Sequence, residues 1–467
     1  MKNFDFKIIY SIAIILLLIF YCIVPKGADF WVIVPCLIIF YFLLFMSFAK
    51  PIQVGNIKSY FKIDLLFYMF SYLLYYYPYQ KYILGLTDLT TQYTRLNQYI
   101  EYTNMSIILS TIAMLAFALG YSTYKKRNGT ISDFVVRNNI VPTTRQINRL
   151  ICIILLVTIP LCIYFFIENG ISALIYAYGS DYALIDFNTM PVYRELSFFV
   201  MILSALSVYY WKYYKKINLI FILSIITILI WALYVVLSGD RNGFFLIIVV
   251  IIVEYFTIIR AISRKYIILF SFGALLLYNV LEIAREADDR NIDTYVEAYK
   301  EMQQKDGNSF NITTLGYRAT FDYIPEKHDF FYGNFLFLSI TSIVPFLSAQ
   351  FIDTNDVYKS SSSTLTYYLY GTYNSRGGGV GTNIITDLYM DFGVIGVLVI
   401  MFLMGRISVF FQNKITLNYN SIKWVVLYTI TLSFFSEIAR YGLVFAVRGI
   451  TWTFLFFLVF GRTWKRI

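Results

Sequence analysis

The chain has 467 residues, of which 59% are hydrophobic and only 14% are charged, and its formal net charge is +10. This composition lies far outside the range of soluble domains, so it excludes a soluble protein. The basic residues do not form an aromatic-interleaved patch, and nucleic-acid binding is excluded with them.

Apolar runs recur along the chain at the length that crosses a membrane, which is about 20 residues for a helix. We predict an all-α polytopic membrane protein with about twelve transmembrane helices. The first run lacks a small-residue cleavage site and is expected to be a retained helix. The predicted spans are 8–24, 29–49, 63–80, 105–124, 150–168, 195–211, 217–237, 243–259, 266–282, 384–405, 424–440 and 443–460.

The distribution of charge predicts the orientation, because Lys and Arg are retained on the cytoplasmic side of a membrane. With the N-terminus inside, most of the 38 basic residues fall in cytoplasmic segments. Most of the 28 carboxylates then lie on or toward the outer side. Both termini are therefore expected in the cytoplasm.

The spans divide the chain into three parts. Residues 1–282 hold the first nine helices, residues 283–383 form one large outer loop with amphipathic or re-entrant helices, and residues 384–467 hold the last three helices and a cytoplasmic C-terminus. The apolar run 333–350 is almost long enough to span. A span there would move the basic residues of the C-terminal part outside, so we predict a re-entrant or interfacial helix broken by Pro345.

The turn SGDRNGFF, residues 238–245, places a charged pair between two membrane-length helices at the predicted outer surface. Turn geometry and lipid phosphates account for such a pair taken alone. Further arginines gather near the same surface, and together they predict an anion site. The candidate substrate-binding residues are Asp240, Arg241, Arg285, Arg318, Arg376, Arg440 and Arg448.

Arg448 is the most demanding of these because it lies roughly 9 Å inside the last predicted span. A charge inside a membrane normally faces a polar cavity or pairs with an opposite charge. Glu437 and Asp391 are candidate protein partners, and a phosphate is the alternative. Arginine suits a diphosphate because its planar fork makes bidentate, charge-assisted hydrogen bonds.

A glycine-rich stretch, SRGGGVGTN, comes just before the predicted span 384–405. Gly377, Gly378 and Gly379 permit a backbone nest for an anion at a helix N-terminus, and they join the candidate substrate-binding set. No Gly-Lys-Ser/Thr follows, so a nucleotide-binding P-loop is not indicated.

Acid–base candidates lie around the same surface. Asp387 and Asp391 are four residues apart and share one helix face. Either they pair with Arg440 or Arg448, or one of them is a base aimed at a sugar hydroxyl. The only histidine lies in the outer loop, where it is a further candidate base. The candidate catalytic residues are Asp387, Asp391, His328 and Glu437.

The sequence indicates neither a metal site nor a disulfide framework. The four cysteines all fall within predicted spans, and no cluster of His, Cys and carboxylates has the spacing of a metal site. We therefore expect no metal and no cofactor.

The turn SGDRNGFF after a long helix, the long late outer loop and RGGGVGTNIITDLYMDFGVIGVLVIMFLMG together resemble the Wzy-type O-antigen or oligosaccharide repeat-unit polymerases. The resemblance covers about residues 217–460 and extends to the GT-C class of integral-membrane glycosyltransferases. It implies a bacterial inner-membrane enzyme whose active site faces the periplasm or exterior.

The implied reaction moves a growing glycan from its polyprenyl diphosphate onto the next lipid-linked repeat unit, which builds an O-antigen or capsule. The implied partners are the lipid-linked donor and acceptor and the membrane lipid, with a chain-length regulator as a further candidate. Two alternatives stay open: an O-antigen ligase, which shares the donor chemistry, and a flippase of the lipid-linked unit. A flippase needs polar residues along a central cavity, whereas here the charges gather near one end.

The predicted topology can be tested by labelling. A cysteine introduced at position 306 or 356 should react with an impermeant thiol reagent from outside, and one at position 127 should not, because positive-inside retention places them on opposite sides. The reverse pattern in intact cells would overturn the orientation.

Overall fold

The computed structural model describes residues 3–90, 94–123, 141–169, 190–237, 241–269, 309–344, 357–371 and 383–461, with residues 273, 293, 296, 297, 300, 347, 380 and 381. The N-terminal part holds α1 (Asn3–Ile23), α2 (Phe30–Ala49), β1 (Ile52–Val54), β2 (Ile57–Ser59), α3 (Ile63–Tyr75), α4 (Tyr77–Ile83), α5 (Thr94–Asn97), η1 (Ile100–Tyr102) and α6 (Thr103–Thr123). The middle part holds α8 (Thr144–Asn169), α9 (Met190–Tyr214), α10 (Leu219–Leu237), α11 (Arg241–Glu254) and η3 (Tyr255–Ile259). The C-terminal part holds α14 (Ser309–Tyr323), α15 (Asn334–Thr341), η4 (Val357–Lys359), α17 (Ser361–Tyr370), α18 (Ile384–Leu417), α19 (Ile422–Tyr441) and α20 (Leu443–Phe460).

Nine helices within the described residues are long and apolar enough to cross a membrane, and α3 and α20 contain shorter apolar helices. Every predicted span except 266–282 coincides with a helix, and that one lies largely outside the described residues. The predicted span 63–80 is interrupted at Tyr76, and Pro78 sits in the first turn of α4, where its missing N–H costs no hydrogen bond. The chain is thus an all-α polytopic membrane protein at the coarse level, and the number of its spans stays a prediction.

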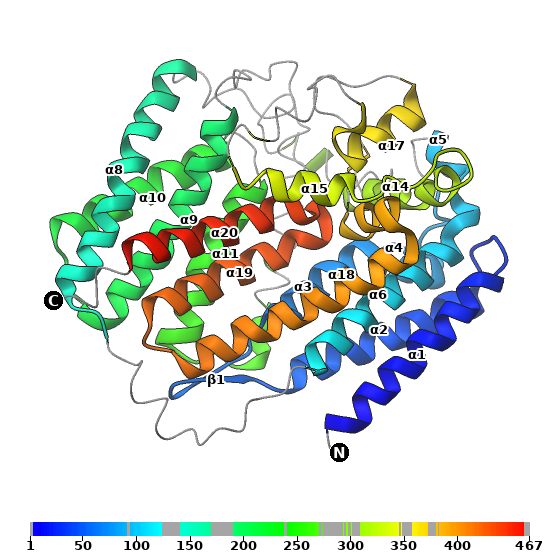
Figure 1. The fold of residues 1–467 in the computed structure, drawn as a ribbon, viewed down its shortest axis with the longest axis horizontal. Coiled ribbons are helices and arrows are strands. Elements are labelled where there is room, and N and C mark those ends of the chain that lie inside the picture. The colour runs from blue at the N-terminus through cyan, green and yellow to red at the C-terminus, as the bar shows by residue number, and fades with distance from the viewer. Residues whose placement is uncertain are drawn as a thin grey trace.

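Helices α6 and α19 lie at the centre of the fold and are the most completely buried of the candidate spans (Figure 1). Helix α6 packs against α1, α2 and α18, and α19 packs against α3, α9, α11, α18 and α20. Helix α9 in turn packs against α8, α10 and α11. Through α19 and α9, the N-terminal, middle and C-terminal helices form one packed body.

The contact between α6 and α18 depends on two glycines. A Cβ at Gly120 would overlap the carbonyl oxygen of Phe402, and one at Gly405 would overlap that of Phe117. Small residues allow such backbone approach between membrane helices. A larger residue at either position would overpack the contact, at a typical cost of about 1–3 kcal/mol.

One short hairpin departs from the predicted all-α class. Strands β1 and β2 pair antiparallel, with Ile52 opposite Ser59, around a two-residue Gly55–Asn56 turn. Gly55 has a φ of 58°, which suits the primed turns of such hairpins. The Tyr428 hydroxyl donates to the carbonyl of Phe61 just after the hairpin, so this loop is tied to α19.

Residues 283–383, which the sequence predicts to be an outer loop and which we call the outer segment, contribute short helices that lie across the C-terminal ones (Figure 1). Within the predicted re-entrant run 333–350, the described part contains the eight-residue helix α15, which is too short to span. Just after the C-terminal end of α15, the carbonyl of Ile343 accepts a hydrogen bond from the indole N–H of Trp452 in α20 at 2.9 Å.

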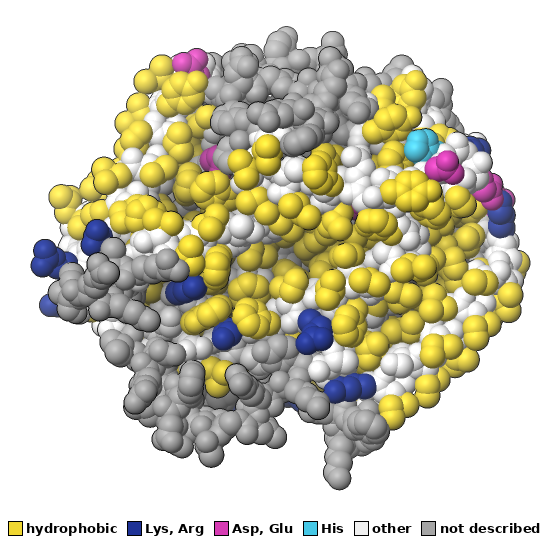
Figure 2. Space-filling model, viewed as in Figure 1, with side chains coloured by type: hydrophobic (Ala, Val, Ile, Leu, Met, Phe, Trp, Pro, Cys, Tyr) yellow, Lys and Arg dark blue, Asp and Glu magenta, His cyan; other side chains and the backbone are white. Residues whose placement is uncertain are grey.

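Figure 2 shows how charge is distributed on one face of the molecule. Most of the described Lys and Arg side chains on this face lie toward the lower part of the view, and the Asp and Glu side chains lie toward the upper part. A broad hydrophobic surface separates them. This is the asymmetry expected of a protein that crosses a membrane.

Candidate functional site

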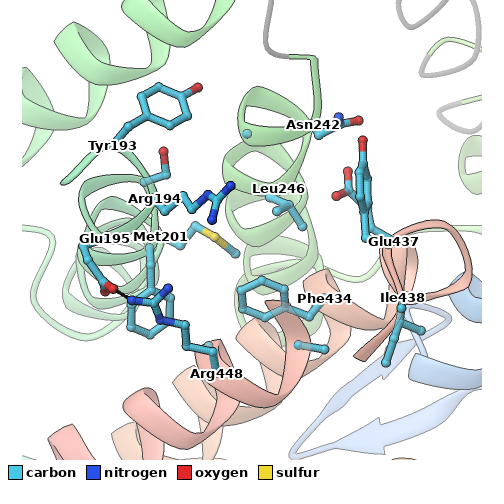
Figure 3. A pocket seen from close by; sticks show the side chains of 17 residues that line it. Tyr193, Arg194, Glu195, Met201, Asn242, Leu246, Phe434, Glu437, Ile438 and Arg448 are labelled. Carbon is cyan, nitrogen blue, oxygen red and sulfur yellow. Dashed lines mark ion pairs between the residues drawn. The ribbon is translucent and has the colours of Figure 1, made fainter. Parts of the chain in front are cut away.

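A cavity of about 220 Å³ lies between the ends of α9, α11, α19 and α20 (Figure 3). Its walls are mainly apolar, with side chains that include Phe198, Met201, Leu246 and Phe434. Its polar and charged lining comes from Tyr193, Arg194, Glu195, Ser197, Asn242, Glu437, Tyr441 and Arg448. The described lining of the cavity thus combines four charged side chains with mainly apolar walls.

A glycine allows two of these helices to end at the cavity. Gly442 separates α19 from α20 with φ 68° and ψ −161°, a region that essentially only glycine occupies. A Cβ there would also overlap a carboxylate oxygen of Asp387. Gly442 therefore both turns the chain and brings the start of α18 against the cavity wall.

Arg448 is paired within the cavity. Its guanidinium forms an ion pair with Glu195 of α9, and both side chains are about one-fifth exposed, at 22% and 23%. The sequence had offered Glu437 and Asp391 as candidate protein partners, and the ion pair that the structure shows is with Glu195. A residue of α9 takes their place because α9 and α20 face each other across the cavity, which no spacing in the sequence reveals (Figure 3).

Arg194, Asn242 and Glu437 are further polar residues that line the cavity. Arg194 interacts electrostatically with Arg448 as a like charge. Asn242 and Glu437 lie on the side away from Glu195 in Figure 3. Glu437 is 8% exposed and sits in the last turn of α19. Among the described residues, two cationic and two carboxylate side chains therefore line the cavity.

Several predicted residues lie elsewhere or outside the described residues. Arg241 begins α11 next to Asn242 at the cavity, although its side chain is not described. Arg440 places its guanidinium 5.1 Å from the ring centre of Tyr441 and does not line the cavity. Six residues that were predicted to form an anion site lie outside the described residues: Asp240, Arg285, Arg376, Gly377, Gly378 and Gly379.

Asp391 has a clear structural partner. Its two carboxylate oxygens accept hydrogen bonds from the backbone N–H groups of Phe335 at 3.1 Å and Leu336 at 2.8 Å. These are unpaired donors at the N-terminus of α15, where a negative charge is also favourable. The alternative that Asp391 pairs with Arg440 or Arg448 was wrong, because α15 occupies both oxygens.

Asp387 lies one helical turn earlier, in the first turn of α18. The Ser361 hydroxyl of α17 donates to its carboxylate, and Gly442 packs against it. Asp387 is therefore next to the cavity wall without lining the cavity.

Helix α18 is interrupted two residues after Asp391, where Gly393 has φ 63° and ψ −155°. This break separates the short first part of α18, which carries both aspartates, from the rest of the helix.

His328 lies in an aromatic cluster of the outer segment. Its ring stacks on Phe331, with centroids 4.5 Å apart and an interplanar angle of 10°, and also on Tyr323. Nearby, burial alone would raise the pKa of Asp322. Hydrogen bonds from Lys327, Tyr368 and Tyr102 together hold that pKa below its ordinary value. This cluster does not line the cavity.

Arg318 is completely buried in α14. It donates to the Thr103 hydroxyl at 3.2 Å and to the carbonyl of Leu89 at 3.5 Å. Burial lowers the pKa of its guanidinium from the ordinary value. These contacts join the outer segment to α6, away from the cavity.

Sequence reasoning missed Tyr193, Arg194 and Glu195. We expected the span to begin at residue 195, whereas α9 begins at Met190. The available signal was a charged Arg-Glu pair directly before the apolar run SFFVMILSALSVYY. In the structure, Glu195 is the sixth residue of α9, as Arg448 is the sixth residue of α20.

No group of three or more His, Cys, Asp and Glu side chains is arranged to hold a metal ion in the described parts of the chain. The described charged side chains that line the cavity are two arginines, Arg194 and Arg448, and two glutamates, Glu195 and Glu437.

The fold and the cavity define an integral membrane protein of many helices with a charged site at the ends of four of them. A protein-family model described as O-antigen polysaccharide polymerase Wzy matches residues 6–465, nearly the whole chain. The chain therefore belongs to this family, as the sequence motifs predicted. No curated protein and no solved structure matches it.

Membership assigns the chain to the polymerases of O-antigen repeat units, which act on lipid-linked oligosaccharides in the membrane. It is accordingly a multi-pass inner-membrane protein of polysaccharide biosynthesis.

The position of Asp391 yields a prediction. Asp391→Asn keeps one oxygen able to cap α15, so it should retain most of the polymerising activity, whereas Asp391→Ala should lower stability by about 1 kcal/mol. Thermal unfolding of the detergent-purified variants, alongside polymer length, measures both. An Asn variant with unchanged stability but abolished polymerisation would instead identify Asp391 as a base.

Proposed function

We propose that the cavity between α9, α11, α19 and α20 is the glycosyl-transfer site, and that its arginines bind the diphosphate of a polyprenyl-diphosphate-linked donor. The observation that carries this proposal is Arg448, a cation in the second turn of an apolar helix that faces an apolar-walled cavity. Arg194 lies beside it.

The chemistry of the reaction requires such cations. When the glycosyl–oxygen bond breaks, its electron pair stays on the diphosphate, and the developing charge must be neutralised in the transition state. Guanidinium groups match phosphate oxygens bidentately and keep their charge when partly desolvated. The apolar walls strengthen these interactions because they lower the local dielectric constant.

Glu437 is the best-placed base for the acceptor among the candidate catalytic residues, because it alone of them lines the cavity. We propose that its carboxylate accepts the proton of the attacking sugar hydroxyl while the new glycosidic bond forms. Arg241 at the start of α11 would add to the diphosphate site from the rim, as would Arg376 if its segment reaches the cavity.

The cavity also lies at the helix ends that the charge distribution predicts to be outer. The opposite ends of α9, α11–η3 and α19 carry Lys212, Arg260 and Lys423. We therefore propose that transfer takes place on the periplasmic or exterior side, with both termini in the cytoplasm. Family membership favours a polymerase over a ligase or a flippase.

The assay that tests this function uses purified protein and one lipid-linked repeat unit. A ladder of products is expected, whereas movement of the lipid across a vesicle membrane without new bonds would indicate transport.

Arg448→Lys should reduce polymerisation at least about tenfold, because Lys loses the bidentate fork and charge-assisted bonds contribute about 1.5–3 kcal/mol.

A matched control for this variant is Arg264→Lys, which removes a guanidinium that contacts the Ala49 carbonyl and the Tyr60 ring, away from the cavity. Its polymer should have normal length and amount. Normal polymer from Arg448→Lys at normal expression would place the diphosphate site elsewhere.

We further propose that transfer needs no divalent cation, because the cavity arginines take the place of the metal that often neutralises a diphosphate. Polymerisation should then persist in excess chelator after washing, with the same chain-length distribution. Complete loss of activity that magnesium or manganese restores would contradict this mechanism.

A further inference from the structure

Glu195 forms an ion pair with Arg448, the cation that we propose binds the donor diphosphate. We propose that Glu195 is an internal competitor: it holds Arg448 when the cavity is empty, yields it to the donor, and takes it back as the leaving polyprenyl diphosphate departs. This inference rests on the proposed function, and it assigns control of product release to a residue of α9.

The geometry makes the competition direct. Glu195 and Arg448 both line the same cavity, from opposite helices, and each is only about one-fifth exposed. A carboxylate and a phosphate engage a guanidinium through the same fork of N–H donors. Glu195 contacts the Nη2 atom of Arg448, and Nε has no hydrogen-bond partner among the described protein groups. A diphosphate that binds Arg448 bidentately through Nη2 therefore competes with the Glu195 carboxylate.

The charge inventory points the same way. The described lining of the cavity contains Arg194 and Arg448 against Glu195 and Glu437, so its formal charges balance without substrate. Intramembrane charges are costly unless they are paired. Glu195 thus stabilises the empty site, which would otherwise hold an uncompensated cation, and it repels an anion that arrives.

The reaction itself makes release a difficulty. The donor carries a diphosphate diester with two ionised oxygens. When the glycosyl–oxygen bond breaks, the electron pair stays on the diphosphate while the acceptor proton moves to Glu437. The leaving group then has a terminal phosphate, whose second pKa is about 6, and so bears more negative charge than the donor did.

Arg448 consequently binds the leaving group more tightly than the donor, which favours the transition state but slows departure. A carboxylate that remains beside the guanidinium lowers the affinity for both ligands by competing at every stage of the cycle. Its effect is greatest where release limits turnover, as it does in many enzymes.

The test compares Glu195→Gln with the unaltered protein, using farnesyl diphosphate as a soluble probe of the leaving group. Calorimetry in detergent should show binding tightened about tenfold, because a competing charge has been removed. With sub-saturating lipid-linked repeat unit, the first turnover should speed up while the steady-state rate falls. Added farnesyl diphosphate should inhibit the variant at lower concentrations.

Glu168→Gln is the matched control, since Glu168 is an exposed carboxylate near the end of α8 that does not line the cavity. It should leave probe affinity and turnover unchanged. If Glu195→Gln does not fold, Glu195→Asp, whose shorter side chain reaches Arg448 less well, is measured instead with the same expected direction.

A folded Glu195 variant that binds farnesyl diphosphate equally or more weakly would overturn the inference and leave the pair a structural contact. Failure of the proposed function has a different signature: Arg448→Gln would then bind the probe as tightly as the unaltered protein. Tighter binding in the Glu195 variant together with lost binding in the Arg448 variant supports both.

Discussion

Inside a lipid bilayer, every backbone N–H and C=O group must find its partner within the protein, and this constraint decides where the helices of this chain run and where they stop. Helical hydrogen bonding satisfies it along the apolar runs. Interruptions are tolerated only where side chains or other segments replace the lost bonds. In the described structure they occur at Tyr76, at the π-helical turn η3, at Gly393 and at Gly442.

Two glycine breaks determine how the helices beside the cavity are positioned. Gly393 and Gly442 have nearly the same backbone conformation, one that other residues rarely adopt. The short helical piece that ends at Gly393 carries Asp387 against Gly442 and uses Asp391 to cap α15. Helix α15, α18 and the α19–α20 turn are thereby joined beside the cavity.

Charge inside the fold follows a second constraint, since a buried charge without a partner is costly. Lys62 pairs with Asp64 at 3.2 Å, Asp391 binds two backbone amides, and Arg448 binds Glu195. The first two are closed arrangements among protein groups. The third lines a cavity, and this is the ground on which we propose that its partner exchanges with a ligand.

The sequence by itself determined the class of protein, the approximate positions of the helices and the family. Apolar runs of membrane length and the motifs around Arg241 and Arg376 are local properties, and local spacing suffices to predict them. It also identified Arg448 and Glu437 as candidates, because a charged residue within an apolar run is easily recognised in the sequence.

Only the tertiary structure decided which residues these side chains contact. Glu195 lies more than two hundred residues from Arg448, and Phe335 and Leu336 lie far from Asp391 in the sequence. His328 and Arg318 lie away from the cavity, although the sequence made both of them candidates. Such pairings depend on which helix faces which, and helix packing is set by the shapes of many side chains together, including the glycines at 120 and 405, so no single motif encodes it.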